Sequence, residues 1–343
     1  MNKEFLVGYL ILFAIAALIS CVLSLVLRGL SGVLRLRAVG KDGKMMPLVG
    51  GLAIFLCIFV FFLFLLCFTI APMGDMFSFY PYFLCFIIPY FLLGLLDDIV
   101  RRPWTKLMGF LPAVGFCWLL YFLTDAHFYY YNYKNAYSIP LLLFGTLFFS
   151  SSYNLLDNAD GHCATAVLGL LCGFVFIPDT IDMDLLLVFI PGTILGFLLL
   201  DLPGKAKIRL GNAGGLMLGA AAFFLTYTMA CEQRIGIDLK IAFIFAFLAY
   251  PLYDTITMIL LKAKRWQDPV EHYSHRLMRG GFSLWLVNGL VFLLSGPLPF
   301  AFYRFLPRTL FLACPFVIWG ILLFADVLAA SLAEMGGNSS KSA

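Results

Sequence analysis

Long apolar blocks separated by short polar loops follow one another along the whole chain. A helix needs roughly 20 apolar residues to cross the hydrocarbon core of a bilayer, and these blocks approach that length. We therefore predict about ten or eleven membrane-spanning helices. Their expected ranges are 5–27, 48–71, 81–96, 107–124, 139–154, 164–177, 185–200, 212–231, 240–261, 282–295 and 309–330. The blocks that begin at Ile139, Ala164 and Phe282 are short, so individual helices are expected to be tilted or broken.

The expected fold class is all-α, a polytopic α-helical integral membrane protein. Of the residues, 62% are hydrophobic and 12% charged, whereas soluble domains have about 45–50% apolar and about 25% charged residues. This composition excludes an ordinary soluble domain. We expect one membrane-embedded domain over residues 1–343, with a short disordered tail from about residue 335. The nine cysteines show no CxxC spacing and are expected to be reduced and buried.

The distribution of Lys and Arg predicts the orientation in the membrane. If alternate loops lie on opposite sides, seventeen of the 23 basic residues fall on one side and six on the other. The positive-inside rule places the richer side in the cytoplasm, with the N-terminus outside and the C-terminus inside. We therefore predict a bacterial inner-membrane protein. Its basic cytoplasmic loops suit anionic phosphates and lipid head groups, and no nucleic acid is expected as a partner.

Two acidic motifs follow apolar blocks on this predicted cytoplasmic side. Asp97 and Asp98 are adjacent at the end of one block, and two neighbouring carboxylates repel unless a cation lies beside them, as in a Mg²⁺ site. Asn154, Asp157 and Asp160 follow another block with a spacing that places them on one face of a helical turn. The alternatives are solvated charges that close a helix and an ordinary hydrated loop.

Two glycine-rich helix starts lie on the same side. Lys44 precedes the pair Gly50–Gly51, and a basic stretch that includes Arg209 precedes a start at Gly211. Glycines at a helix N-terminus let backbone N–H groups approach a phosphate, and a lysine adds a positive charge. The alternative is that these glycines only permit close packing of helices.

A final cytoplasmic motif combines histidine with arginine. His272 and His275 are three residues apart, and Arg276 and Arg279 follow them. This combination suits a diphosphate. Zinc ligation is not expected, because no third ligand of the right kind is spaced nearby.

Taken in order, these loops resemble the polyprenyl-phosphate N-acetylhexosamine-1-phosphate transferase superfamily, which includes the MraY, WecA and TagO enzymes. The resemblance covers nearly the whole chain. It implies that a lipid phosphate attacks the β-phosphate of a UDP-sugar donor, that UMP leaves, and that Mg²⁺ is required, with Mn²⁺ as an alternative. The stretch from Pro47 to Gly51 and the stretch from His272 to Phe282 resemble the WecA/TagO branch, which favours an N-acetylhexosamine phosphate donor.

The resemblance implies three sets of site residues. The catalytic set is Asp97, Asp98, Asp157 and Asp160; the substrate-binding set is Lys44, Asn154, Arg209, His272, His275, Arg276 and Arg279; the metal ligands are Asp97, Asp160, Asn212 and Asp201. The implied partners are a polyprenyl phosphate lipid, a UDP-sugar and the membrane, and a homodimer is one assembly that the sequence allows.

This chain departs from the family pattern at several positions. Ser274 replaces a histidine, Asn158 replaces a glycine, and Arg209 stands where many members have a phenylalanine that packs on uracil, so its guanidinium is expected to stack there. Asn212 replaces an aspartate that binds Mg²⁺, and Gly215 replaces a serine.

The change at Asn212 bears most on the metal. An amide oxygen still coordinates Mg²⁺, and Asp201 is a hypothetical replacement for the lost carboxylate. Because a phosphate monoester has a second pKa near 6, the attacking group is already an anion. Weaker metal binding is therefore expected, more than the loss of a chemical step.

The sequence leaves three functions to compare. The first is an active transferase that builds a lipid-linked sugar for a surface polysaccharide. The second is a homologue that binds lipid phosphate or nucleotide sugar without turnover. The third is a secondary transporter with an acidic relay, which would place its ionisable groups near the bilayer midplane.

Overall fold

The computed structural model describes residues 3–39, 45–68, 76–100, 115, 138–177, 184–201, 206–233, 235–264 and 271–339. Almost all of this part is helical. The helices are α1 (Lys3–Leu30), α2 (Gly50–Phe68), α3 (Met76–Val100), α5 (Ser138–Leu156), α6 (His162–Phe174), α7 (Asp184–Leu198), α8 (Gly211–Glu232), α9 (Ile237–Phe247), α10 (Ala249–Lys264), α11 (Tyr273–Arg279), α12 (Leu284–Ser295), α13 (Pro297–Phe305), α14 (Arg308–Phe311) and α15 (Cys314–Ser339). Two short strands, β1 (Arg37–Val39) and β2 (Met45–Pro47), form an antiparallel pair.

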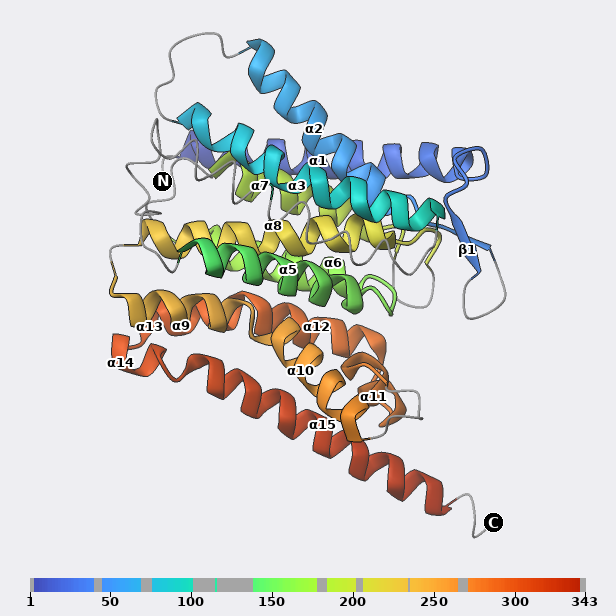
Figure 1. The fold of residues 1–343 in the computed structure, drawn as a ribbon, viewed down its shortest axis with the longest axis vertical. Helices are drawn as coiled ribbons and strands as arrows, with labels where there is room; N and C mark the ends of the chain where they lie inside the picture. The colour runs from blue at the N-terminus through green and yellow to red at the C-terminus, as the bar shows by residue number, and fades with distance from the viewer. Residues whose placement is uncertain are drawn as a thin grey trace.

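The long helices form a layered bundle with α8 in the middle, between α3 and α5 (Figure 1). Helix α8 is buried along nearly its whole length, because it carries small residues on every side. Gly219 shows the closeness of the packing, since a Cβ there would lie 2.7 Å from the carbonyl oxygen of Phe149 on α5. Small residues let helix backbones approach in this way. The two termini lie at opposite ends of the bundle (Figure 1).

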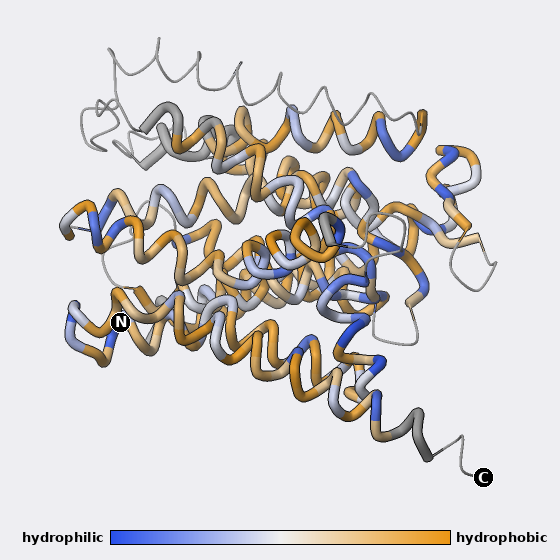
Figure 2. The backbone as a smooth tube through the Cα atoms, turned by 60° about the horizontal axis from the view of Figure 1, so that its bottom comes forward, coloured by the Kyte–Doolittle hydropathy of each residue, from blue (hydrophilic) through white to orange (hydrophobic). Residues whose placement is uncertain are grey.

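Five described helices are long and apolar enough to cross a membrane, and the bent pair α9–α10 makes a sixth if it counts as one span. Helices α2, α6 and α7 are shorter apolar helices. Large apolar side chains such as Leu18 on α1 and Phe324 on α15 are exposed, as expected for surfaces that face lipid. Hydrophilic segments gather toward the end of the bundle that carries the C-terminus (Figure 2). The prediction of a polytopic, all-α membrane protein is confirmed.

Most predicted helices have a counterpart, with differences at their ends. Helix α3 continues to Val100, four residues beyond the predicted end, so Asp97 and Asp98 belong to its last turns. Helix α15 runs to Ser339, so residues 335–339 are helical and not a disordered tail. The predicted helix 107–124 lies outside the described residues apart from residue 115.

The expected single helix over 240–261 is wrong in one respect, because it breaks at Leu248 into α9 and α10, with a bend of 71°. Pro251 lies in the first turn of α10 and has no N–H to donate to the preceding turn, which explains why one helix does not continue through this point. The sequence also did not predict α11 or α13 as helices. Helix α13 begins with a proline after Gly296, a favourable start.

The starts of α2 and α8 are joined through the segment before α8. Arg209 donates its N–H to the carbonyl of Pro47 at 2.8 Å, and its own carbonyl accepts from the N–H of Gly50 at 2.9 Å. A Cβ at Gly51 would lie 2.2 Å from the backbone nitrogen of Gly214, so only glycine fits there. Close packing therefore explains these glycines, and it fixes the backbone from which Arg209 projects.

Candidate active site

The N-terminus of α8 is capped by two carboxylates from distant segments. Asp98, which is 1% exposed, accepts hydrogen bonds from the N–H groups of Asn212 and Ala213, both at 3.0 Å. Asp157, just after α5, accepts from the N–H of Gly211 at 3.1 Å. The first N–H groups of a helix lack partners within it and carry partial positive charge, so carboxylates are stabilising there.

Asp97 is more accessible than Asp98 and contacts a side chain of α8. The Asn212 amide donates from Nδ2 to Asp97 Oδ2 at 3.0 Å. An aspartate at position 212 would place a second negative charge beside Asp97 and would call for a cation between them. The amide replaces that repulsion with a hydrogen bond.

Asp160 forms an ion pair with Arg209, with the guanidinium Nη2 2.9 Å from Asp160 Oδ1. The two side chains are 19% and 25% exposed, so a ligand that enters from solvent can reach both. The Nε of Arg209 is buried and has no hydrogen-bond partner within the described residues. The arginine that replaces the expected phenylalanine is therefore in contact with a predicted catalytic carboxylate.

Asp201 supports the backbone of the acidic loop, which is residues 157–161 between α5 and α6. Gly161 adopts a positive φ of 66°, which favours glycine, and its N–H donates to Asp201 Oδ2 at 3.1 Å. Asp201 is 1% exposed, and its Oδ1 has no hydrogen-bond partner in the described part of the chain. Burial and the nearby charge of Asp157 hold the pKa of Asp201 well above its usual range. Asp201 and Asn212 thus contact different partners.

The carboxyl of Asp157 titrates near neutral pH. Desolvation by the surrounding protein raises its pKa to about 7, against the opposing effects of the Arg209 charge and the Gly211 N–H. Asp98 and Asp160 add to the increase. Close carboxyl groups therefore share one region and cannot all be charged without cost.

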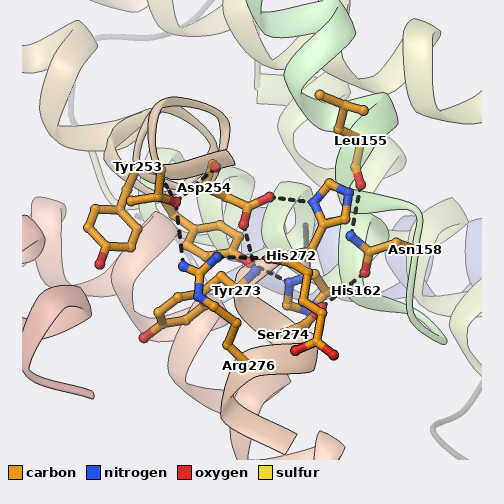
Figure 3. Close-up of polar contacts among 12 residues, drawn as sticks. Leu155, Asn158, His162, Tyr253, Asp254, His272, Tyr273, Ser274 and Arg276 are labelled. Carbon is orange, nitrogen blue, oxygen red and sulfur yellow. Dashed lines mark hydrogen bonds and ion pairs between the residues drawn. The ribbon is translucent and has the colours of Figure 1, made fainter. Parts of the chain in front are cut away.

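The histidine motif begins at His272, just before α11, and is held by Asp254 of α10 (Figure 3). His272 Nδ1 is 3.0 Å from Asp254 Oδ2, and the N–H of Tyr273 donates to Asp254 Oδ1 at 2.7 Å. Asp254 is fully buried and therefore fixes both the His272 ring and the start of α11.

Helix α11 is also joined to the acidic loop. Ser274 donates to Asn158 Oδ1 at 2.9 Å, and Asn158 donates to the carbonyl of Leu155 at 2.9 Å (Figure 3). Ser274 and Asn158 are two of the departures from the family pattern. They are therefore hydrogen-bonded to each other.

A third departure has a similar explanation. A Cβ at Gly215 would lie 2.5 Å from Asn154 Oδ1, so the serine expected there would clash with Asn154 as it is placed. This oxygen of Asn154 is buried without a hydrogen-bond partner among the described residues.

A fully buried histidine connects the acidic loop to α10 and α12. His162 Nδ1 is 2.6 Å from Asn288 Oδ1, and His162 Nε2 contacts the hydroxyl of Tyr250. The amide of Asn288 also donates to the carbonyl of Asp160 at 3.1 Å. The backbone of the acidic loop is thus held by α12 as well as by Asp201.

The remaining predicted binding residues lie farther out on α11. Arg276 makes a bidentate ion pair with Asp326 of α15, in which Nε donates to Oδ1 and Nη2 donates to Oδ2, both at 2.9 Å. Arg279 pairs with Glu271 at 2.9 Å, and both are exposed. His275 is partly buried on the same helix. Lys44 lies outside the described residues.

Sequence reasoning assigned no role to several residues that shape this region. Asp254 and Asp326 are lone carboxylates inside apolar blocks, which is a recognised sign of function or of a specific partner. That signal was present in the sequence. His162 and Asn288 gave no comparable signal, because their contact joins segments 126 residues apart.

The donor chemistry suits a divalent cation, although the described residues include no group of three His, Cys, Asp or Glu side chains placed to hold a metal ion. Mg²⁺ usually keeps several waters and is held by one or two carboxylates together with substrate phosphates. Asp97 and Asp160, both accessible, and the amide of Asn212 fit that manner of binding.

The fold and this acidic site define a multi-pass α-helical membrane protein with carboxylates gathered at one helix N-terminus. The model described as glycosyl transferase family 4 matches residues 80–230, which contain Asp97, Asp98, Asp157, Asp160 and Asn212. A protein of Thermotoga maritima described as undecaprenyl-phosphate alpha-N-acetylglucosaminyl 1-phosphate transferase is 26% identical over 298 residues, covering 83% of this chain and 84% of that protein. Both similarities support a relationship of this chain to glycosyl transferase family 4.

Proposed function

We propose that this protein transfers a sugar-1-phosphate, namely N-acetylhexosamine-1-phosphate, from a UDP-sugar to a polyprenyl phosphate such as undecaprenyl phosphate. UMP is released, and the product begins a lipid-linked polysaccharide or cell-wall glycan. The family and the printed name of the Thermotoga maritima relative support phospho-sugar transfer to undecaprenyl phosphate. The N-acetylhexosamine, the WecA/TagO branch and the metal are the finer parts of this proposal.

One observation carries the proposal. Carboxylates from α3 and from the loop after α5 meet at the N-terminus of α8, where Asp98 and Asp157 bind its first N–H groups. Asp97 and Asp160 lie in the same cluster, bound to Asn212 and Arg209. This places accessible carboxylates beside a helix N-terminus, and phosphoryl transfer uses both kinds of group.

The accessible and the buried carboxylates have different roles in this proposal. Asp97 and Asp160 face the substrates, whereas Asp98 and Asp201 hold the backbone of α8 and of the acidic loop. Because the lipid phosphate is already an anion near neutral pH, the protein mainly has to orient two phosphate groups and balance their charge. Asp157, with a pKa of about 7, adds a charge that depends on pH.

Magnesium, or manganese in its place, would be held by Asp97, Asp160 and the Asn212 amide, whereas Asp201, the further ligand expected from the sequence, is 1% exposed and holds the loop backbone instead. When bound, the ion neutralises charge on the transferred phosphoryl group. The donor diphosphate would lie toward His272 and His275, with Arg279 at the exposed rim. Asp254 orients His272, and Arg276 fixes α11 through Asp326.

The site is proposed to face the cytoplasm, with the N-terminus outside and the C-terminus inside, because UDP-sugars are cytosolic and the positive-inside rule predicts that side for the basic loops. A homodimer is compatible with this arrangement. Carboxylates at helix ends, such as Asp97 and Asp157, argue against the transporter alternative, which would use groups near the midplane.

The test is UMP release by the purified protein with undecaprenyl phosphate and a panel of UDP-N-acetylhexosamines, with and without Mg²⁺. We expect metal-dependent UMP release with one donor. The proposal would be contradicted if no donor in the panel gave UMP release while a thermal unfolding transition in detergent showed that the protein was folded. Release that does not change on chelation of the metal would contradict its metal component only.

A second candidate is binding of lipid phosphate or nucleotide sugar without turnover. The hydrogen bond between Asn212 and Asp97 favours it, because this pair is satisfied without a cation. Saturable binding of UDP-sugar with no UMP release at saturating Mg²⁺ would support this candidate over the first.

A further inference from the structure

Arg209 projects from a fixed backbone into the acidic site. Both its N–H and its carbonyl are paired with the segment that begins α2, through Pro47 and Gly50. The next residues begin α8, whose first N–H groups bind Asp98 and Asp157. Only the side chain of Arg209 is therefore free to change its position relative to the site.

The guanidinium uses little of its hydrogen-bonding capacity in this state. It carries five N–H donors, and its one hydrogen bond within the described residues goes from Nη2 to Asp160 at 2.9 Å. Its Nε is buried with no partner in the described part of the chain. The contact with Asp160 is thus monodentate, whereas a guanidinium binds phosphate oxygens best in a bidentate manner, with two parallel hydrogen bonds.

The charge of Arg209 acts on more than one carboxyl. Besides its ion pair with Asp160, it opposes the effect of burial on Asp157 and on Asp201. Asp97 and Asp98 complete the set of carboxylates around the start of α8. A divalent cation at Asp160 would therefore meet a resident positive charge, and two cations on one carboxylate repel each other.

We infer that Arg209 is an exchangeable counter-ion, which neutralises Asp160 in the unliganded site and moves to the donor's phosphates when a divalent cation takes its place. The inference rests on the proposed function, because that function supplies the cation and the nucleotide diphosphate. Guanidinium groups recognise phosphate with bidentate hydrogen bonds, and the fixed backbone keeps Arg209 within reach of the site.

This exchange couples the two ligands. Without nucleotide, Arg209 competes with the metal for Asp160; without metal, Asp160 holds Arg209 away from the phosphates. Each ligand therefore strengthens binding of the other by the same factor, as linkage requires. The expected coupling is about 10-fold or more, within the usual range for linked sites.

The experiment measures Mn²⁺ binding to the purified protein by the electron paramagnetic resonance signal of free Mn²⁺, with and without saturating UDP. A titration without protein corrects for the Mn²⁺–UDP complex. In the wild type we expect UDP to tighten Mn²⁺ binding about 10-fold or more. In Arg209→Gln we expect Mn²⁺ alone to bind about 10-fold tighter and the coupling to fall below about 3-fold.

Arg304→Gln is the matched control, because Arg304 is exposed on α13 at the other end of the bundle. It should show the wild-type affinity and coupling. Uridine in place of UDP separates phosphate recognition from stacking on the base. Uridine should give no coupling, and coupling as large as that of UDP would overturn the exchange in favour of stacking.

The outcomes separate this inference from the proposed function. A wild type that neither binds Mn²⁺ nor releases UMP removes the proposed function. A wild type that does both, together with an Arg209→Gln variant of unchanged Mn²⁺ affinity and coupling, removes the inference alone. If Arg209→Gln does not fold, the Arg209→Lys variant tests the inference instead, because lysine keeps the positive charge but cannot form bidentate hydrogen bonds. Mn²⁺ affinity should then stay within about 3-fold and UDP affinity should fall about 10-fold, and unchanged UDP affinity would overturn the inference.

Discussion

His162 and Asn288 fix each other's orientation inside the bundle. The Asn288 amide donates from Nδ2 to the carbonyl of Asp160, so its Oδ1 faces His162 Nδ1, 2.6 Å away, and that nitrogen must carry the proton. The other ring nitrogen then accepts from the hydroxyl of Tyr250. One amide thus sets a histidine tautomer and supports the backbone of the acidic loop.

Replacing this amide should affect both stability and activity. In Asn288→Leu, a buried N–H of His162 and the carbonyl of Asp160 lose their partner. We expect a loss of about 1–3 kcal/mol in unfolding free energy. UMP release should fall more steeply than donor binding, because the loop that carries Asp160 is less well positioned. Thermal unfolding in detergent and steady-state kinetics measure the two effects.

The control for this change is Ser331→Ala, which removes only an exposed hydrogen bond within α15. It should leave both measurements unchanged. An Asn288→Leu protein with wild-type kinetics would show that the loop does not depend on this contact.

The substitutions Asp97→Asn and Asp98→Asn should have different effects on stability. In Asp98→Asn, an amide replaces a carboxylate that accepts two backbone N–H groups, so one acceptor and the charge at the start of α8 are lost. We expect a loss of about 1–3 kcal/mol together with loss of activity. In Asp97→Asn, stability should be nearly unchanged and UMP release should be lost. Equal destabilisation by both changes would contradict this division of roles.

Stability should depend on pH through Asp157. Its pKa in the folded protein is about 7, above the ordinary value of 3.8. The folded state therefore binds more protons than the unfolded state between these values, and the stability should fall as pH rises from about 4 to about 7. Above this window the effect is complete and should stay constant.

Asp157→Asn removes this titration. As pH rises from 4 to 7, the unfolding temperature of the variant should therefore fall less than that of the wild type. The two pKa values correspond to a change on the order of 4 kcal/mol across the window. Asp201, whose pKa is also raised, acts in the same direction and keeps part of the slope. Parallel profiles for the wild type and Asp157→Asn would exclude this role of Asp157.

Gly51→Ala tests the close contact between α2 and α8. The added Cβ would lie 2.2 Å from the backbone nitrogen of Gly214, which is not a position that a side-chain movement can relieve. We expect a loss of about 1–3 kcal/mol or more. Gly320→Ala on α15 is the matched control, since nothing lies within 4 Å of its Cβ, and it should be neutral or stabilising. Equal unfolding temperatures for both variants would contradict the contact.

The hydrogen bond between Ser274 and Asn158 predicts that their mutations are not additive. Ser274→Ala and Asn158→Gly should each reduce stability, and the double variant should lose less than their sum. A coupling of about 0.5–1.5 kcal/mol in thermal unfolding is expected. Full additivity would show that this contact between α11 and the acidic loop contributes nothing.

Much of the fold could be predicted from the sequence, because apolar blocks that match the bilayer thickness form helices whatever their neighbours. Most of the predicted blocks are helical, including α1, α2, α5 and α8. The break at Leu248 was missed, since apolar residues continue on both sides and only Pro251 indicates it. The extension of α3 that includes Asp97 and Asp98 was missed because charged residues look like a helix end.

The sequence predicted site residues in several separate loops and said nothing about their hydrogen-bond partners. The motifs that contain Asp98, Asp157 and Asn212 do meet at the start of α8. The sequence also showed that Arg209 and Asn212 depart from the family pattern. It did not show that each of them contacts a predicted catalytic carboxylate, Asp160 and Asp97 respectively.

The sequence by itself determined the class of protein, the approximate set of helices and the polar loops that carry the chemistry. These follow from local properties, because hydropathy and loop chemistry are read within a short segment. Only the tertiary structure decided which donor satisfies each carboxylate. Those pairs join residues 49 and 115 positions apart, as for Arg209 with Asp160 and Asn212 with Asp97, and only helix packing brings them within hydrogen-bond distance.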